Sequence, residues 1–258
     1  MERPVLRLAA DVGNTRSSFG LFDDGSLVGR WRVGTRHWTA DELWLMVSGL
    51  LRTAEVPNPE SVAFACVVPQ LRHALLEMCS DRLKVDVVEV GPDTAGIEVD
   101  YPFPSELGAD RLSNAAAALK LGASPAIVAD FGTATTFDVI DDEGRYVGGA
   151  IAPGIGVSAS ELFKKAERLS PVDLRFPPSP LGRSTAQAIQ SGVLFGAVGA
   201  AERMVRLLSS ELRGNPTLWA TGGWAAGIVA RCGYEFEVVP ELTLIGIDEI
   251  GRLNEEVL

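Results

Sequence analysis

Two segments of the chain place an aspartate, a glycine and small polar side chains in the same order. Asp11-Val12-Gly13-Asn14-Thr15 follows an apolar stretch that ends at Ala10, and Asp130-Phe131-Gly132-Thr133-Ala134-Thr135 follows one that ends at Ala129. Glycine lets the backbone turn tightly and approach a ligand, and successive N–H groups in such a turn can hold an anion. Because an aspartate repels phosphate oxygens unless a cation lies between them, a phosphate site here implies Mg²⁺.

The repetition of this pattern is more informative than either copy. A single Asp-x-Gly turn is also typical of an ordinary hairpin, which has no chemical role. The two aspartates, however, lie almost half of the 258-residue chain apart, and each turn is followed by two further predicted strands joined by a second turn. Two copies of one strand–turn–strand unit explain this echo. We therefore expect two facing turns that hold the phosphates of a nucleotide across a cleft.

A third candidate site is Gly108-Ala109-Asp110-Arg111, which precedes an alanine-rich helix expected over residues 112–121. There Asp110 could act as the base for a substrate hydroxyl, and Arg111 could bind an anionic part of the same substrate. The alternative interpretation is a helix start with an acidic first turn and a surface ion pair. Histidine is the less attractive base, because His37 and His73 lie away from the glycine turns.

Helices and strands alternate between these motifs. A capping box at Thr39 and Glu42 opens one predicted helix, and Ser184 opens a long one expected to run towards Leu212. The closing segment, Leu244–Leu253, is amphipathic and could form a helix that packs back across the two halves. This alternation predicts an α/β protein.

A glycine pair late in the chain and the repeated strand–turn–strand unit give two further predictions. Gly222-Gly223 follows a short predicted strand and would let a flat ring lie against the backbone, although an ordinary strand-to-helix loop explains it equally well. We expect two similar domains with mixed sheets, residues 1–115 and 116–258. The last helix is expected to pack on the first domain.

Composition excludes several classes of partner. The chain has 23 Lys and Arg residues against 34 Asp and Glu, a net charge of −11, which argues against a basic surface for nucleic acid or anionic membrane. Its cysteines have no C-x-x-C spacing, so neither a disulfide framework nor a thiolate zinc site is indicated. The first residues lack the long apolar segment of a signal peptide, and the most apolar stretch, Gly192–Ala201, is about half of the ~20 residues that span a membrane. We expect a soluble, cytoplasmic protein.

Together the motifs resemble those of the type III pantothenate kinase family. Asp11–Thr15 is similar to its first phosphate motif, Gly108–Arg111 to its substrate motif and residues 130–138 to its second phosphate motif. The similarity runs in order from Asp11 to near Gly246. Further similar positions are Gly148–Gly154, Ser184-Thr185 and Thr221–Gly223.

The resemblance implies the duplicated ribonuclease-H-like fold of actin, sugar kinases and acetate kinase, with an active cleft between two similar domains. It also implies ATP-dependent phosphorylation of pantothenate to 4'-phosphopantothenate, the first step of coenzyme A biosynthesis. Asp110 would be the catalytic proton acceptor. ATP would be bound by Asp11, Val12, Gly13, Asn14, Thr15, Arg16, Ser17, Ser18, Thr133, Gly222 and Gly223, and pantothenate by Tyr101, Gly108, Ala109, Asp110, Arg111 and Thr185.

The same resemblance implies cations and a partner subunit. Asp11 would contact Mg²⁺ through phosphate or water, and Asp130 is similar to the residue that binds an activating monovalent cation, K⁺ or NH₄⁺. In the family, the threonine equivalent to Thr185 comes from the partner subunit, so a homodimer is implied.

One position departs from the family pattern. Many members have Asn where this chain has Phe103, two residues after Tyr101, so an amide hydrogen bond at that place is lost. The three aspartates and Arg111 are present, and an active enzyme is expected. The alternatives are a kinase of the same fold that acts on another small hydroxyl compound, or a non-catalytic regulatory relative.

Overall fold

The computed structural model describes residues 6–166 and 169–255. The chain divides into two compact units: the residues up to Gly122 and those from Glu241 on form the first, and Ala123–Pro240 the second. The boundary expected between residues 115 and 116 lies inside a helix, α3 (Ala109–Lys120), which belongs wholly to the first unit. Residues 111–118 of this helix are all buried.

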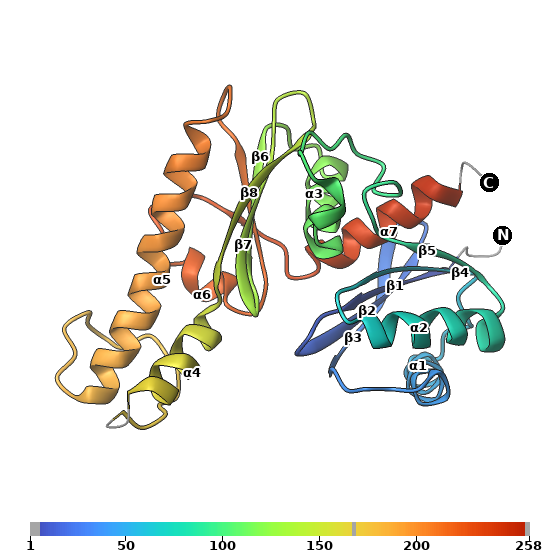
Figure 1. Ribbon diagram of the computed structural model, residues 1–258, viewed down its shortest axis with the longest axis horizontal. Helices are drawn as coiled ribbons and strands as arrows, with labels where there is room; N and C mark the ends of the chain where they lie inside the picture. The colour runs from blue at the N-terminus through green and yellow to red at the C-terminus, as the bar shows by residue number, and fades with distance from the viewer. Residues whose placement is uncertain (1–5, 167–168, 256–258) are drawn as a thin grey trace. The chain divides into compact units, whose positions relative to one another are not determined.

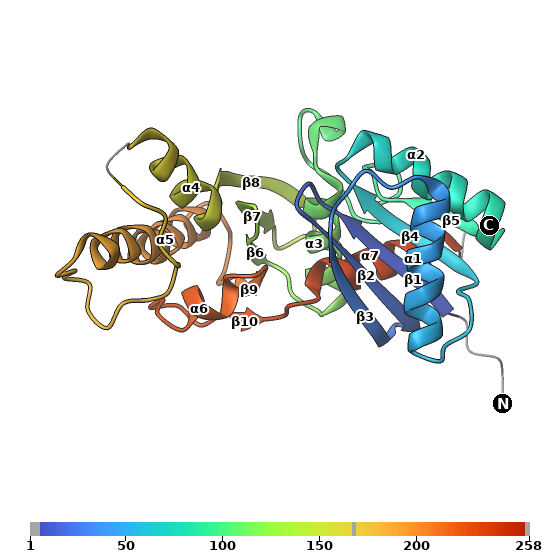
Figure 2. The ribbon, with the colours of Figure 1, turned by 90° about the horizontal axis from the view of Figure 1, so that it is seen from below.

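The first unit contains a five-stranded sheet in the order β3-β2-β1-β4-β5. β1, β2 and β3 form an antiparallel meander, whereas β4 lies parallel to β1 and β5 parallel to β4. The α1 and α2 helices pack on one face, and α7 packs against β1 and β4 from the other (Figures 1 and 2). The bounds are β1 (Leu6–Val12), β2 (Arg16–Asp23), β3 (Ser26–Gly34), α1 (Ala40–Thr53), β4 (Ser61–Cys66), α2 (Pro69–Glu77), a π-helical turn (Met78–Leu83), β5 (Asp86–Glu89), a 3₁₀ turn (Pro104–Glu106) and α7 (Leu242–Glu255).

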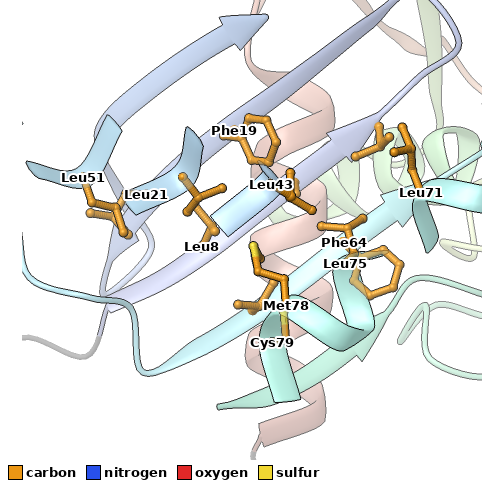
Figure 3. Packing of buried hydrophobic residues seen from close by; sticks show 14 of the residues in the cluster. Leu8, Phe19, Leu21, Leu43, Leu51, Phe64, Leu71, Leu75, Met78 and Cys79 are labelled. Atoms are coloured by element: carbon orange, nitrogen blue, oxygen red, sulfur yellow. The ribbon is translucent and has the colours of Figure 1, made fainter. Parts of the chain in front are cut away.

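Alternation along β1 separates the two faces of this sheet. Leu8 joins the apolar cluster under α1 and α2, whereas the neighbouring Arg7 points to α7, where its side chain approaches Gly251. The predicted capping box of α1 is confirmed, and it sets the helix so that Leu43 and Leu51 are buried (Figure 3). The cluster in Figure 3 is filled by Leu8, Phe19, Leu21, Leu43, Leu51, Phe64, Leu71, Leu75, Met78 and Cys79.

The second unit repeats the sheet of the first. Its strand order is β8-β7-β6-β9-β10, again with three antiparallel strands followed by two parallel ones. The duplication expected from the two aspartate turns is therefore confirmed at the level of topology. Apolar residues of this sheet pack against α4, α5 and α6. The bounds are β6 (Ala126–Phe131), β7 (Ala134–Ile140), β8 (Tyr146–Pro153), α4 (Ile155–Lys165), α5 (Thr185–Ser209), β9 (Thr217–Thr221), α6 (Ala225–Val229) and β10 (Glu237–Val238).

The long helix α5 begins where the sequence predicts. The Ser184 hydroxyl accepts a hydrogen bond from the backbone N–H of Gln187 at 3.2 Å, which is the expected N-cap. The helix ends at Ser209, before the predicted Leu212, and Gly214 then adopts a left-handed φ of 83°. Among the described residues, no helix combines the length and the apolar character needed to cross a membrane.

Candidate functional site

The first aspartate turn is closed by hydrogen bonds at both of its ends. The Gly13 N–H donates to the Arg16 carbonyl at 3.1 Å, and the Thr35 hydroxyl donates to the Gly13 carbonyl at 2.7 Å. The Ser17 and Thr35 hydroxyls lie 2.8 Å apart. Thr35 was not predicted as a site residue, because it comes from the end of β3 and no local pattern links it to the turn. Thr35 directly follows β3, so its hydrogen bonds hold the end of the β2–β3 hairpin against the first aspartate turn.

Exposure divides the predicted residues of this turn into two groups. The side chains of Asn14 and Thr15 are exposed and Asp11 is half-buried, so these groups can reach a ligand. Val12 and Ser17 are buried and belong to the framework of the turn. Arg16 is exposed and Ser18 half-buried.

The end of β4 lies beside this turn. Val12 pairs with Cys66, and the Val67 N–H donates to the Val12 carbonyl at 3.1 Å. Burial raises the pKa of the Cys66 thiol, and the nearby carboxylates of Glu89 and Asp11 act in the same direction. Cys66 is therefore a thiol at neutral pH, and it offers no thiolate to a metal or a substrate.

The third motif forms the first turn of α3. Gly108 is the N-cap residue, and Asp110 and Arg111 follow at the positive end of the helix dipole. One Asp110 carboxylate oxygen accepts a hydrogen bond from the Arg111 N–H at 2.9 Å. The Arg111 side chain is 8% exposed, so the simple surface ion pair considered from the sequence does not describe it. Upstream, Tyr101 is half-buried, whereas the Phe103 ring is 62% exposed.

The second aspartate turn lies beside the loop that follows β9. Asp130 pairs with Thr221, the last residue of β9, and the Trp224 N–H donates to the Phe131 carbonyl at 3.3 Å. The Gly132 N–H closes the turn on the Ala134 carbonyl at 3.0 Å. The structure thus brings Asp130, the exposed Thr133 and the Gly222-Gly223 loop together within the second unit.

Two glycines allow this close packing. Gly222 has a φ of 90°, and a Cβ there would lie 2.5 Å from the Phe131 carbonyl carbon and collide with the Asp130 carboxylate. A Cβ on Gly154 would lie 2.6 Å from the Gly132 carbonyl oxygen, and the Gly154 N–H donates to Thr133 at 3.2 Å. Only glycine permits both approaches, so the turn has its shape because three backbone segments meet without side chains.

Thr185 occupies a different part of the second unit. It is the first residue of α5 and lines a pocket of about 660 Å³ between α4, α5 and the strands β7 and β8. Phe131, which directly follows Asp130, lines the same pocket, and most of its other lining residues are apolar. This pocket was not predicted, because its walls come from segments that are distant in sequence.

The predicted residues therefore fall into four local groups, two in each unit. Residues 11–18 and the start of α3 lie in the first unit, whereas Asp130, Thr133, Gly222-Gly223 and Thr185 lie in the second. Among the described residues, no group of three or more His, Cys, Asp or Glu side chains could hold a metal ion. Each aspartate turn instead supplies one carboxylate, which suits a cation whose other ligands are oxygens of phosphate or water.

Solved structures share this architecture over nearly the whole chain. A Campylobacter jejuni protein described as a Baf family transcriptional activator matches with a TM-score of 0.62 at 19% identity, covering 96% of this chain and 99% of its own. The ROK hexokinase of Thermus thermophilus matches with a TM-score of 0.55 at 15% identity, covering 98% of this chain and 100% of its own. At these identities the likeness establishes the fold, which is the duplicated α/β fold of actin-like ATPases and ROK sugar kinases.

Sequence relatives are more specific. The type III pantothenate kinase of Roseiflexus sp. (strain RS-1) is 41% identical over 251 residues, which cover 96% of this chain and 98% of that protein. The family model of type III pantothenate kinases matches residues 7–207, a range that includes both aspartate turns, the start of α3 and Thr185. With its motifs in the expected order and its fold as expected, the chain belongs to the type III pantothenate kinase family.

Proposed function

We propose that this protein transfers the γ-phosphoryl group of ATP to the hydroxyl of pantothenate, which yields 4'-phosphopantothenate and begins coenzyme A biosynthesis. The observation that carries the proposal is the presence of two topologically equivalent aspartate–glycine turns, at Asp11 and Asp130, and of a separate aspartate at the start of α3. Two turns suit the two ends of a triphosphate, and the third aspartate supplies a base for the acceptor. Family membership identifies the acceptor as pantothenate.

Residues 11–18 bind the ATP phosphates in this proposal. Their exposed members, Asn14, Thr15 and Arg16, supply an amide, a hydroxyl and a guanidinium, while Val12, Gly13 and Ser17 hold the turn in shape. In the second unit the exposed Thr133 contacts ATP. Gly222 and Gly223 leave room for the nucleotide to lie against the backbone.

Pantothenate is proposed to bind at the start of α3. Arg111 binds its carboxylate, because a guanidinium matches a carboxylate in shape and charge. Asp110 accepts the hydroxyl proton, Gly108 and Ala109 form the same end of the helix, and Tyr101 is a further proposed contact of pantothenate. Phe103, at 62% exposure, presents an aromatic ring where the family pattern leads us to expect an amide.

Phosphoryl transfer requires little covalent chemistry from these side chains. The transition state is loose, so the protein mainly aligns the hydroxyl with the γ-phosphorus and neutralises charge. Asp110 orients the hydroxyl and takes its proton as the O–P bond forms. It lies in the first turn of α3, beside the proposed site for the pantothenate carboxylate.

The donor sets fit the cations that the proposal requires. Asp11, half-buried at the end of β1, would hold Mg²⁺ directly or through water, and Asp130 would hold K⁺ or NH₄⁺. When bound, these ions neutralise the phosphate charge that a protein of net charge −11 cannot balance alone. Gly222 and Gly132 both pack close to the Asp130 carboxylate, so backbone surrounds this carboxylate.

We also propose that the protein is a homodimer that acts in the cytoplasm without nucleic acid or membrane partners. The pocket between α4 and α5 supports the dimer, because its wall is apolar and Ala188, Gly192 and Gly196 are exposed along α5. Thr185 lies at the end of this pocket and would complete the pantothenate site of the partner. Sedimentation equilibrium should give twice the monomer mass, and Gly192→Glu should give the monomer with little pantothenate turnover.

A coupled ADP-release assay tests the proposed reaction. We expect turnover with ATP and Mg²⁺ that requires pantothenate, and that is higher in potassium or ammonium than in sodium. Asp110→Asn should retain the fold and lose most turnover, and Asp130→Asn should lose the response to the monovalent cation. Faster turnover with another small hydroxyl acceptor would replace pantothenate in the proposal, and absence of turnover with every acceptor would favour a regulatory role.

A further inference from the structure

The helix that carries Asp110 has no side-chain cap at its start. Its N-cap residue is Gly108, which has no side chain to accept hydrogen bonds from the first backbone N–H groups. Asp110 itself accepts a hydrogen bond from the next N–H, that of Arg111, at 2.9 Å. Because no side chain of the N-cap residue holds the helix start, packing against the following turn contributes to its position.

The α7 helix supplies that packing. The Thr243 hydroxyl donates a 2.8 Å hydrogen bond to the side-chain oxygen of Asn114, which is 1% exposed and lies one helical turn after Asp110. Gly246 sits against the backbone of Ser113, where a Cβ would lie 2.5 Å from the Ser113 carbonyl carbon. The two helices are therefore in backbone contact directly behind the first turn of α3.

This contact connects to the residue before Asp110. The Ser113 side chain is fully buried, and its hydroxyl donates to the Ala109 carbonyl at 2.8 Å. Gly246 thus contacts Ser113, whose hydroxyl is hydrogen-bonded to the first turn of α3. A displacement of α7 at Thr243 and Gly246 would move Asp110 with it.

A second attachment between the same helices lies at the far end of α3. Lys120, in the last turn, places its ammonium 3.0 Å from Glu249 and 3.4 Å from Asp248. It is separated from Asp110 by almost the whole length of the 12-residue helix. The two attachments should therefore differ in their effect on catalysis even where they contribute equally to stability.

We infer that Thr243 and Gly246 of α7 are positioning residues for Asp110, which they hold in place through Asn114 and Ser113. This inference rests on the proposed role of Asp110 as proton acceptor. Neither α7 residue needs to touch substrate. Small displacements of a catalytic group reduce phosphoryl transfer because alignment supplies much of the rate enhancement.

Steady-state kinetics on Thr243 variants test the inference. Thr243→Val keeps the shape of the side chain and removes the hydroxyl, and we expect kcat to fall about tenfold with the KM for ATP unchanged. Thr243→Ser restores the hydroxyl and should restore kcat. Asn114→Ala removes the other partner and should give the same fall in kcat, and the double variant should be no slower than either single variant.

Lys120→Gln is the matched control, because it breaks the attachment that is remote from Asp110 while Asp248 and Glu249 keep their arginine partners. Its urea midpoint should fall as far as that of Thr243→Val, with kcat within about twofold of the unmodified protein. A folded Thr243→Val and a folded Asn114→Ala with unchanged kcat would overturn the inference, as would an equal fall in kcat for Lys120→Gln. If Thr243→Val does not fold, Asn114→Ala decides alone. Asp110→Asn, measured in parallel, distinguishes failure of the proposed base from failure of the positioning inference. High turnover of Asp110→Asn refutes Asp110 as the base. Low turnover of Asp110→Asn together with an unchanged kcat of Thr243→Val refutes only the positioning role.

Discussion

A buried ion pair between β1 and α7 allows a quantitative test of how the C-terminal helix is held. Arg7 is 6% exposed and lies 2.8 Å from Asp248, which is fully buried. The Arg7 guanidinium also pairs with Glu255, and Lys120 approaches Asp248 at 3.4 Å. Arg7→Met removes one partner and leaves Asp248 in the interior with Lys120 as its nearest cation.

The expected loss follows from the burial of the remaining charge. Breaking a buried ion pair by removing one partner costs about 3–5 kcal/mol, mainly because the other charge is left in a low dielectric. The residual contact with Lys120 places Arg7→Met near the lower end, at about 3 kcal/mol. For a chain of this size that corresponds to a decrease of roughly 6–12 °C in Tm.

The double variant Arg7→Met/Asp248→Leu separates the ion pair from general damage. It removes both charges and fills the space with apolar atoms, so it should recover most of the loss. Lys120 then keeps Glu249 at 3.0 Å as a partner. Urea unfolding followed by tryptophan fluorescence monitors both units, because Trp31, Trp38 and Trp44 lie in the first and Trp219 and Trp224 in the second.

An exposed pair on the same unit gives the matched control. Arg82 pairs with Asp41, but both side chains are about half exposed or more, so Arg82→Met should leave the urea midpoint unchanged. A loss below about 1 kcal/mol for Arg7→Met, or a double variant less stable than the single one, would show that desolvation of Asp248 is not what holds α7 on the sheet.

Three further outcomes follow from individual sites. Hydrogen bonds from Arg252 and Lys120 lower the pKa of Glu249 despite its burial. The ionised Glu249 therefore stabilises the folded protein fully above its unfolded pKa near 4.5, and this stabilisation is lost as pH falls through the lower folded pKa. Urea midpoints measured between pH 7 and 3 should accordingly fall less steeply for Glu249→Gln than for the unmodified protein. Gly154→Ala should raise the KM for ATP about tenfold by displacing the Thr133 turn, whereas Gly156→Ala, with open space around it, should not. Burial raises the pKa of Cys79 to about 12, so a thiol reagent at pH 8 should modify it only in denaturant; modification at the rate of a free thiol would contradict its position in the core.

Local sequence signals predicted the parts of the fold that depend on neighbouring residues. The capping box at Thr39 and Glu42 and the Ser184 cap are formed as expected, because each needs only residues three positions apart. The repeated Asp-x-Gly turns predicted a duplicated unit, and the two sheets share one strand order. Helix starts without such a local signal are harder to predict, as in α4, which begins at Ile155 with no side-chain cap. There the Gly154 contact with the Thr133 turn sets the helix start, and that contact is not local.

The candidate site follows the same division. Asp11 and Asp130 lie near the strand ends that their motifs predicted. Asp110 lies in the first turn of α3, which begins at Ala109 rather than at the expected residue 112. The side chains that brace those settings, such as Thr35 and Thr243, were not identified, because their partners lie far away in the sequence. No periodicity or spacing marks a residue whose only role is to accept or donate one long-range hydrogen bond.

The duplication is unequal at one point, and that point concerns the proposed chemistry. In each half a helix follows the outermost parallel strand, α3 after β5 and α7 after β10, yet both helices belong to the first unit. Only α3 carries an Asp-Arg pair in its first turn, while α7 carries Thr243 and Gly246, which contact α3. The second copy of this helix is thus free of a base and serves as the support for the first. A duplicated fold with one acceptor site needs such a difference, since two equivalent bases would have no second acceptor to serve.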